Sequence, residues 1–188
     1  MVSRTVDADE PARDGVACCP VERSLSFEWL YQQHLDGVYA YLLARVGNAE
    51  DAADLAQQVF VQALAGLPRF RGPEAAAKVW LFRIARNLVV DAYRRRRPPG
   101  SVEQNAPWQP PDVADGPEAA ALLRELQAEV RLALARLTAG ERELLALRFA
   151  AGLSSTEIAA VTGKNAAGVK KRLTRLLHRL REDYDDPR

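Results

Sequence analysis

Apolar residues recur three or four positions apart through most of the chain, which is the spacing of helices with one buried face. No β-strand is required anywhere, and glycine and proline separate the periodic segments. The first segment includes Tyr31 in its apolar stripe, and the second turns Leu55, Phe60 and Leu64 inward before Gly66 stops it. The pattern predicts helices over 27–46, 48–66, about 74–96, 117–137, about 139–150, 154–161 and about 165–182.

A break in this pattern divides the chain into two modules. Residues 98–117 contain six of the eleven prolines and two glycines, and they show no helical period. We expect an extended linker there, between a module at 25–97 and another at 118–183, with a disordered tail at 1–24 and a short tail at 184–188. The predicted fold class is all-α, with two small helical domains joined by a flexible proline-rich linker.

Composition narrows the classes of function. Hydrophobic residues make up 48% of the 188 residues and aromatic residues only 7%, which favours packed helices over disorder or sheets. No apolar run reaches about 18 residues, and the N-terminus lacks the apolar centre of a secretory signal. We therefore expect a cytoplasmic protein without membrane insertion. The adjacent pair Cys18 and Cys19 completes no metal site, and no cofactor-binding or catalytic motif is present.

Charge is distributed unevenly, although Lys plus Arg (26) nearly equals Asp plus Glu (25). Residues 69–97 hold nine basic residues against two acids, and residues 164–181 hold seven basic residues and no acid, so each segment carries +7. Residues 25–66 and 98–129 carry −4 and −5. Since each module contains one strongly basic segment, we expect both to contact nucleic-acid phosphates.

The second basic segment follows a helix-turn-helix pattern. Ser154 or Ser155 can cap a first helix that has Glu157 in its first turn, and Gly163 permits the turn before a basic second helix. In such motifs the start of the second helix meets base edges in the major groove, while other cations hold phosphates. We expect Lys164, Asn165, Ala166, Ala167 and Lys170 near bases, and Arg172, Arg175 and Arg179 near phosphates.

The first basic segment interleaves cations with aromatic residues, including Trp80, Phe82 and Tyr93. This composition suits partly single-stranded nucleic acid, because aromatic rings stack on unpaired bases while arginine holds the backbone. Trp80 is equally compatible with a place in the apolar core, and the sequence leaves that choice open.

Three motifs in this order resemble the extracytoplasmic-function (ECF) sigma factors of bacterial RNA polymerase. They are residues 48–60, residues 80–91 with the arginine run that follows, and residues 137–149 with the helix-turn-helix. The resemblance covers about 25–97 and 118–183. It implies an alternative-type sigma factor that binds core RNA polymerase, recognises −10 and −35 promoter elements and promotes DNA melting at transcription initiation, with no catalysis of its own.

The resemblance also implies roles for the matching residues. Those expected to dock against the coiled coil of the largest polymerase subunit are Asp51, Asp54, Leu55, Gln57, Gln58 and Phe60. Arg69, Phe70 and Arg71 would lie in or beside the loop that captures a flipped-out base of the −10 element. Lys78, Trp80, Arg83, Arg86, Asn87 and Arg94 would support the opened strand. Lys164, Asn165, Lys170, Lys171, Arg172 and Arg175 would bind the −35 element as duplex.

The implied partners are core polymerase, promoter DNA as duplex and as melted strand, and an anti-sigma protein, with no cofactor and no metal. The acidic linker would thread towards the RNA exit path of the polymerase. The chain departs from the family pattern at Ala56 and Gln58, where Thr and Glu are frequent, and at Gly168, where Thr is usual. Gly168 is expected to weaken or alter duplex recognition, since glycine inside a helix costs about 1 kcal/mol relative to alanine.

Two other classes of function remain open on the sequence. An autonomous helix-turn-helix regulator explains the C-terminal module but not the N-terminal motif, and DNA binding with and without core polymerase separates the two ideas. A metal-dependent nuclease would use Glu50, Asp51 and Asp54 as ligands. These carboxylates share a helix face only in part and have no histidine beside them, so a solvated first turn is the favoured interpretation.

Overall fold

The computed structural model describes residues 25–96, 130 and 133–185. The predicted linker, the tail at 1–24 and most of the predicted helix at 117–137 lie outside these residues. All regular structure in the described part is helical, which confirms the all-α prediction. The α-helices are α1 (Phe27–Val46), α2 (Ala49–Gly66), α3 (Glu74–Arg96), α5 (Ala139–Leu145), α6 (Ser155–Thr162) and α7 (Ala166–Asp185), with a 3-10 turn at Leu67–Arg69 and a π-helical turn at Ala146–Ala150.

Short polar side chains fix where the helices begin. The Asn48 side chain accepts hydrogen bonds from the backbone N–H groups of Glu50 and Asp51 at the start of α2. Ser154 forms a capping box with Glu157 at the start of α6, at 3.2 Å and 2.7 Å. These bonds satisfy N–H groups that have no partner within the helix, which is why the boundaries follow the sequence closely.

The first domain is a three-helix bundle of α1, α2 and α3. Its core includes Tyr41 and Phe82, whose rings meet edge to face at 5.8 Å. Two predicted core positions are wrong, because Leu64 on α2 is 54% exposed and Tyr31 on α1 is 40% exposed. A helical period locates an apolar stripe, but its edges are covered only where a neighbouring helix reaches them.

The second domain contains the predicted helix-turn-helix. Helices α6 and α7 pack together, α7 also packs against α5, and α6 packs against the π-helical turn that follows α5. Their core includes Leu144, Ile158 and Val169. Gly163 lies between α6 and α7 with a φ of 70°, a left-handed conformation that glycine adopts without a Cβ clash. The turn is therefore the one that the sequence predicts.

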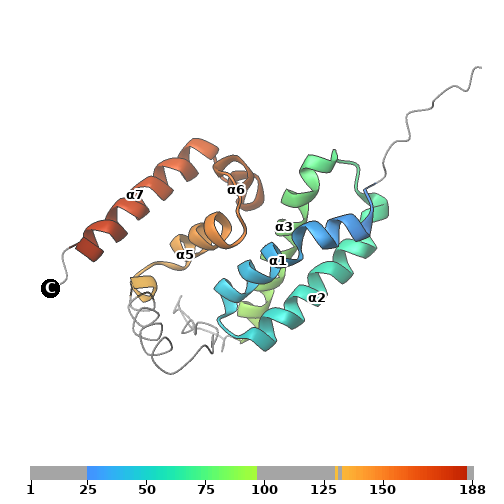
Figure 1. Cartoon of the computed structure of the whole chain (residues 1–188), viewed down its shortest axis with the longest axis horizontal. Coiled ribbons are helices and arrows are strands. Elements are labelled where there is room, and N and C mark those ends of the chain that lie inside the picture. The colour runs from blue at the N-terminus through green and yellow to red at the C-terminus, as the bar shows by residue number, and fades with distance from the viewer. Residues whose placement is uncertain (1–24, 97–129, 131–132, 186–188) are drawn as a thin grey trace, which may run out of the picture.

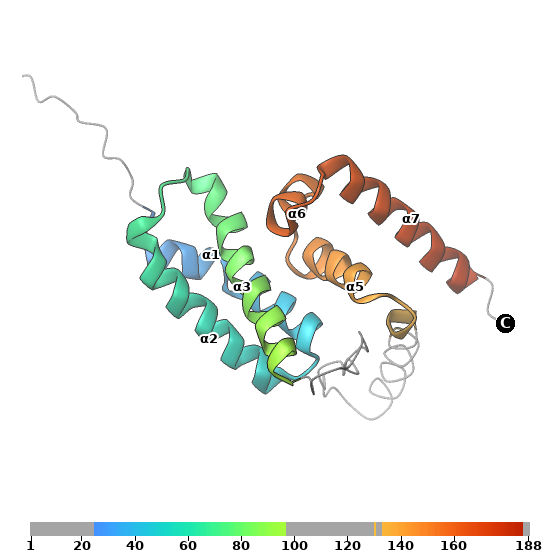
Figure 2. The same cartoon turned by 180° about the vertical axis from the view of Figure 1, so that it is seen from behind.

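The two domains pack against each other, which the sequence does not predict. Figures 1 and 2 show α6 beside α3, and the π-helical turn at Ala146–Ala150 packs against α1. Buried residues of both domains belong to one continuous hydrophobic cluster. At Gly37 on α1, an added Cβ would lie 3.7 Å from the Phe82 ring and 3.9 Å from the carbonyl oxygen of Ala151 in the second domain.

The capping box of α6 gives a prediction about stability. Ser154→Ala removes the side-chain acceptor for Glu157 N–H, so the free energy of unfolding should fall by about 1 kcal/mol, measured by urea denaturation. Ser155→Ala is the matched control, because Ser155 lies inside the helix and does not cap it. Equal effects of the two substitutions would contradict the capping assignment.

Candidate polymerase and nucleic-acid interfaces

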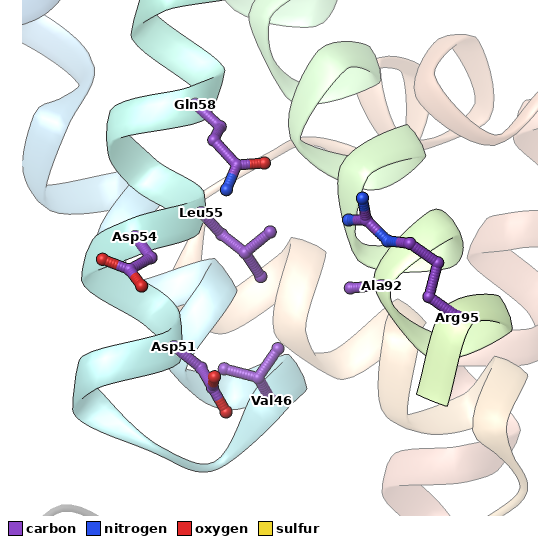
Figure 3. Close-up of a pocket in the computed structure, with 7 residues that line it drawn as sticks. All are labelled: Val46, Asp51, Asp54, Leu55, Gln58, Ala92 and Arg95. Atoms are coloured by element: carbon purple, nitrogen blue, oxygen red, sulfur yellow. The ribbon is translucent and has the colours of Figure 1, made fainter. Parts of the chain in front are cut away.

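The outer side of α2 carries most of the residues predicted to contact polymerase. Asp54, Gln57 and Gln58 are exposed, and Asp51 is half-buried. Figure 3 shows the Arg95 side chain reaching from α3 towards α2 across a pocket of about 190 Å³. The pocket is lined by Val46, Asp51, Asp54, Leu55, Gln58, Ala92 and Arg95. This mixed polar surface could receive another protein's side chains.

Two predicted contact residues are instead part of the core. Leu55 is 6% exposed at the pocket, and Phe60 is 4% exposed, with its ring 4.8 Å from that of Tyr31. Burial leaves Phe60 no surface for direct docking, so its contribution is to hold α2 against α1. Val61 and Leu64, which the family motif does not mark, are 67% and 54% exposed on α2. Their spacing from Gln57, four and seven positions, places them on the same helix face and was the available signal.

The loop before α3 holds an aromatic pair. The rings of Phe70 and Trp80 lie 5.0 Å apart with 38° between their planes, and Trp80 is half-buried. Arg71 Nη1 donates to the carbonyl oxygen of Pro68 at 2.7 Å and holds the loop closed on itself. Trp80 thus packs against the core, which is one of the two alternatives that the sequence left open, and it also borders the predicted base-capturing loop.

Three of the predicted −10 cations on α3 contact the second domain. Lys78 Nζ donates to the carbonyl oxygen of Gly152 at 3.1 Å, and Arg83 donates twice to that of Ala160, at 2.9 Å and 2.7 Å. Arg86 Nε lies 2.9 Å from a carboxylate oxygen of Glu143. Arg83 nonetheless stays exposed, as do the polar −10 candidates Arg69, Arg71, Asn87 and Arg94.

Burial and nearby charges shift the pKa values of several side chains where the two domains meet. Burial raises the pKa of Glu157, but hydrogen bonds at Ser154 and the positive charge of Lys78 outweigh it, so the pKa lies below its usual value. Burial lowers the pKa of His34, and the Lys78 charge lowers it further. Burial also raises the pKa of the Tyr41 hydroxyl. The contact between the domains therefore favours an ionised Glu157 near a neutral His34.

The predicted −35 cations project from the turn and the start of α7. Lys164, Lys170, Lys171, Arg172 and Arg175 are all exposed. Asn165 is also exposed, but its Oδ1 accepts hydrogen bonds from Ala167 N–H and Gly168 N–H at 2.8 Å and 3.4 Å, so it caps α7. A groove of about 260 Å³ beside this helix is lined by Leu144, Lys164, Asn165, Gly168, Val169, Arg172 and Arg175.

Neither a metal cluster nor a membrane span is found in the described part of the chain. No three His, Cys, Asp or Glu side chains there gather closely enough to hold an ion, and this includes the Glu50–Asp54 region of the nuclease hypothesis. No described helix is long and apolar enough to cross a bilayer. The arrangement consists of charged and aromatic surfaces on helices.

Comparison with known protein families identifies the family to which this chain belongs. Residues 30–98 match the Sigma-70 region 2 family, and residues 127–180 match the Sigma-70 region 4 family. The chain is an ECF RNA polymerase sigma factor. It thus belongs to the proteins that direct promoter recognition and transcription initiation, and nothing in the comparisons indicates catalytic activity.

Individual relatives support this assignment. The sigma factor is 35% identical to the ECF sigma factor BldN of Streptomyces coelicolor over 84% of its own length and 61% of BldN. It is 38% identical to the ECF sigma factor ShbA of Streptomyces griseus over 68% of its length and 69% of ShbA. A solved structure of the sigma factor RpoE with the anti-sigma factor NepR, from Bartonella quintana, aligns with a TM-score of 0.60 and 25% identity, covering 86% of this chain and 98% of that one.

The aromatic pair gives a prediction specific to this sigma factor. At Gly66 an added Cβ would lie 2.9 Å from Trp80 Cζ2, so Gly66→Ala should push the indole off Phe70 and lower the free energy of unfolding by about 1–2 kcal/mol. Thermal unfolding and tryptophan fluorescence report the change. Gly140→Ala is the control, because a Cβ there meets nothing within 4 Å, and it should be neutral or stabilising. A Gly66→Ala variant as stable as this control would show that the contact is unimportant.

Proposed function

We propose that this sigma factor divides its work among three surfaces. The exposed face of α2 binds core RNA polymerase, the loop at 66–73 with α3 holds the melted −10 element, and the start of α7 binds the −35 element as duplex. The observation that carries the proposal is the separation of cations between two helices of different domains, with the Phe70 and Trp80 rings beside the first set.

The polymerase surface combines a polar pocket with exposed apolar residues. Asp54, Gln57 and Gln58 lie beside Val61 and Leu64 on α2. An apolar side chain that is exposed in a free protein gains free energy when a partner covers it, and the polar residues around it set specificity. Gln58 stands where Glu is frequent in the family, so this surface has one negative charge fewer.

The two DNA surfaces suit different forms of the promoter. The start of a helix-turn-helix recognition helix fits the major groove, and the exposed cations of α7 lie where phosphates would pass. Phe70 and Trp80 instead offer rings to unpaired bases. A chain that binds duplex at one element and single strand at the other favours melting between them, since binding energy selects the opened state.

We also propose that the chain acts in the cytoplasm with the polymerase and is held inactive by an anti-sigma protein. The support for this control is the structural likeness to RpoE in its complex with NepR. The chain itself supplies binding and positioning, and the phosphodiester chemistry belongs to the polymerase.

The polymerase surface is tested at Val61. Val61→Asp places a charge in an apolar contact and should weaken binding to core polymerase by about tenfold, measured by fluorescence anisotropy. Gln62→Asp adds the same charge at the adjacent exposed position and should change the affinity little. Binding that is equally strong for wild type and Val61→Asp would move the polymerase surface elsewhere.

The −35 surface is tested at Lys170 and Lys171. Replacing either with Glu should reduce affinity for −35 duplex at least about tenfold and flatten its salt dependence, because a phosphate contact is lost and a repulsion gained. Core polymerase binding should be unchanged. Arg136→Glu makes the same charge change at another exposed site and serves as the control. Equal loss of polymerase and DNA binding would contradict the division of roles.

A gel shift with promoter DNA, with and without core polymerase, distinguishes the sigma factor from the alternative of an autonomous regulator. The sigma factor should bind a full promoter tightly only with core polymerase present. Each domain alone offers few contacts, and holding both on the polymerase raises the effective concentration for the second contact once the first has formed. Tight, sequence-specific binding by the chain alone would favour the regulator.

A further inference from the structure

We propose that Gly72 and Arg71 are positioning residues for the base that the loop at 66–73 captures. They hold the Phe70 ring against Trp80 before DNA binds, and they act through that ring rather than by contact with the base. The inference rests on the proposed function, because it takes this loop as the site of a flipped-out base. It adds which residues of the loop build the stacking surface and which one is left to hold the strand.

Two glycines near the ends of this loop make room for the aromatic pair. At Gly72 an added Cβ would lie 2.8 Å from Phe70 Cζ and 3.2 Å from Phe70 Cε2. At Gly66 an added Cβ would lie 2.9 Å from Trp80 Cζ2. Separations below 3.0 Å are closer than Cβ atoms come to other heavy atoms in proteins. Each ring therefore lies where only a glycine leaves space for it.

Backbone conformation does not explain these two glycines. The described glycines with a positive φ are Gly47, Gly152 and Gly163, and neither Gly66 nor Gly72 is among them. The φ of −87° at Gly66 is one that other residue types adopt freely. Close approach of another group to the backbone is the second reason for which a chain needs glycine. Glycine is therefore required at both positions by the rings and not by the turn.

Arg71 holds the backbone that carries the Phe70 ring. Its Nη1 donates to the carbonyl oxygen of Pro68 at 2.7 Å and to that of Phe70 at 3.3 Å. Phe70 N–H in turn donates to the carbonyl oxygen of Leu67 at 3.0 Å and closes the 3-10 turn. The Arg71 guanidinium thus binds carbonyl groups of its own loop. Arg69 forms no hydrogen bond or ion pair with the described residues, so it is the arginine of the loop that remains for a phosphate.

The aromatic pair has the properties of a preformed binding surface. The Phe70 and Trp80 rings lie 5.0 Å apart with 38° between their planes, and both side chains are half-buried against the hydrophobic core. An aromatic ring that stays partly exposed can stack on an unpaired base. A ring that is already held in place loses little conformational freedom when the base binds, so positioning increases affinity. Gly72 and Arg71 supply that positioning for Phe70.

Binding to single strands that lack one base tests the role of Gly72. The sigma factor in complex with core polymerase is titrated with a fluorescent single strand carrying the −10 element, and with copies in which one base at a time is replaced by an abasic residue. At the captured position the wild type should lose about fivefold or more in affinity, because stacking is lost. In Gly72→Ala the Phe70 ring is displaced, so this abasic penalty should fall below about twofold. Thermal unfolding should change little, because only the far end of a side chain must move.

Two further variants make the result specific to the ring. Gly140→Ala should keep the full abasic penalty, because a Cβ there meets nothing within 4 Å. Phe70→Leu removes the ring, so adding Gly72→Ala to it should cause no further loss of affinity. A full penalty in Gly72→Ala, or additive losses in the double variant, would overturn the proposal. A wild type with no penalty at any position would contradict base capture by the loop itself, and this inference with it.

Salt dependence separates positioning from phosphate binding at the two arginines. Arg69→Gln should flatten the slope of log affinity against log salt concentration by about 0.7, the value for one phosphate contact on a single strand. Arg71→Gln should reduce the abasic penalty and leave that slope unchanged, because it loosens the loop without removing a phosphate contact. A flattened slope with a full abasic penalty in Arg71→Gln would make Arg71 a phosphate ligand and overturn its positioning role.

Discussion

The contact between α3 and α6 is the interaction on which the rest of the structure depends. One face of α3, including Leu81, Phe82 and Val89, is buried in the first domain. Its cations Lys78, Arg83 and Arg86 bind the second domain, which lies far along the chain. A single helix therefore joins the core of one domain to the surface of the other.

This arrangement explains how a nearly neutral chain can bind nucleic acid in a controlled way. The cations of α7 face solvent, whereas several of those on α3 are paired with carbonyl and carboxylate oxygens of the same chain. Pairing within the chain lowers the field that DNA would feel at the −10 surface without removing the residues that bind it.

The parts of the structure that the sequence predicts are those fixed by neighbouring residues. Asn48, Ser154 and Gly163 set helix ends through contacts only a few positions away, so the boundaries of α2 and α6 and the turn before α7 agree with prediction. Which apolar side chains are buried is harder to predict from the sequence. Phe60 is covered by Tyr31 on another helix, whereas Leu64 is 54% exposed. The partners of Lys78 and Arg83 lie more than 70 positions away, and no local pattern marks them.

We expect this chain to direct core polymerase to promoters through two elements at a fixed spacing. The most direct measurement is transcription in vitro by core polymerase with this chain on a library of randomised promoters, followed by sequencing of the transcribed templates. The account predicts start sites that share two short elements at one spacing, and no specific transcripts without the chain. Transcripts that share only one element, or none that depend on the chain, would contradict it.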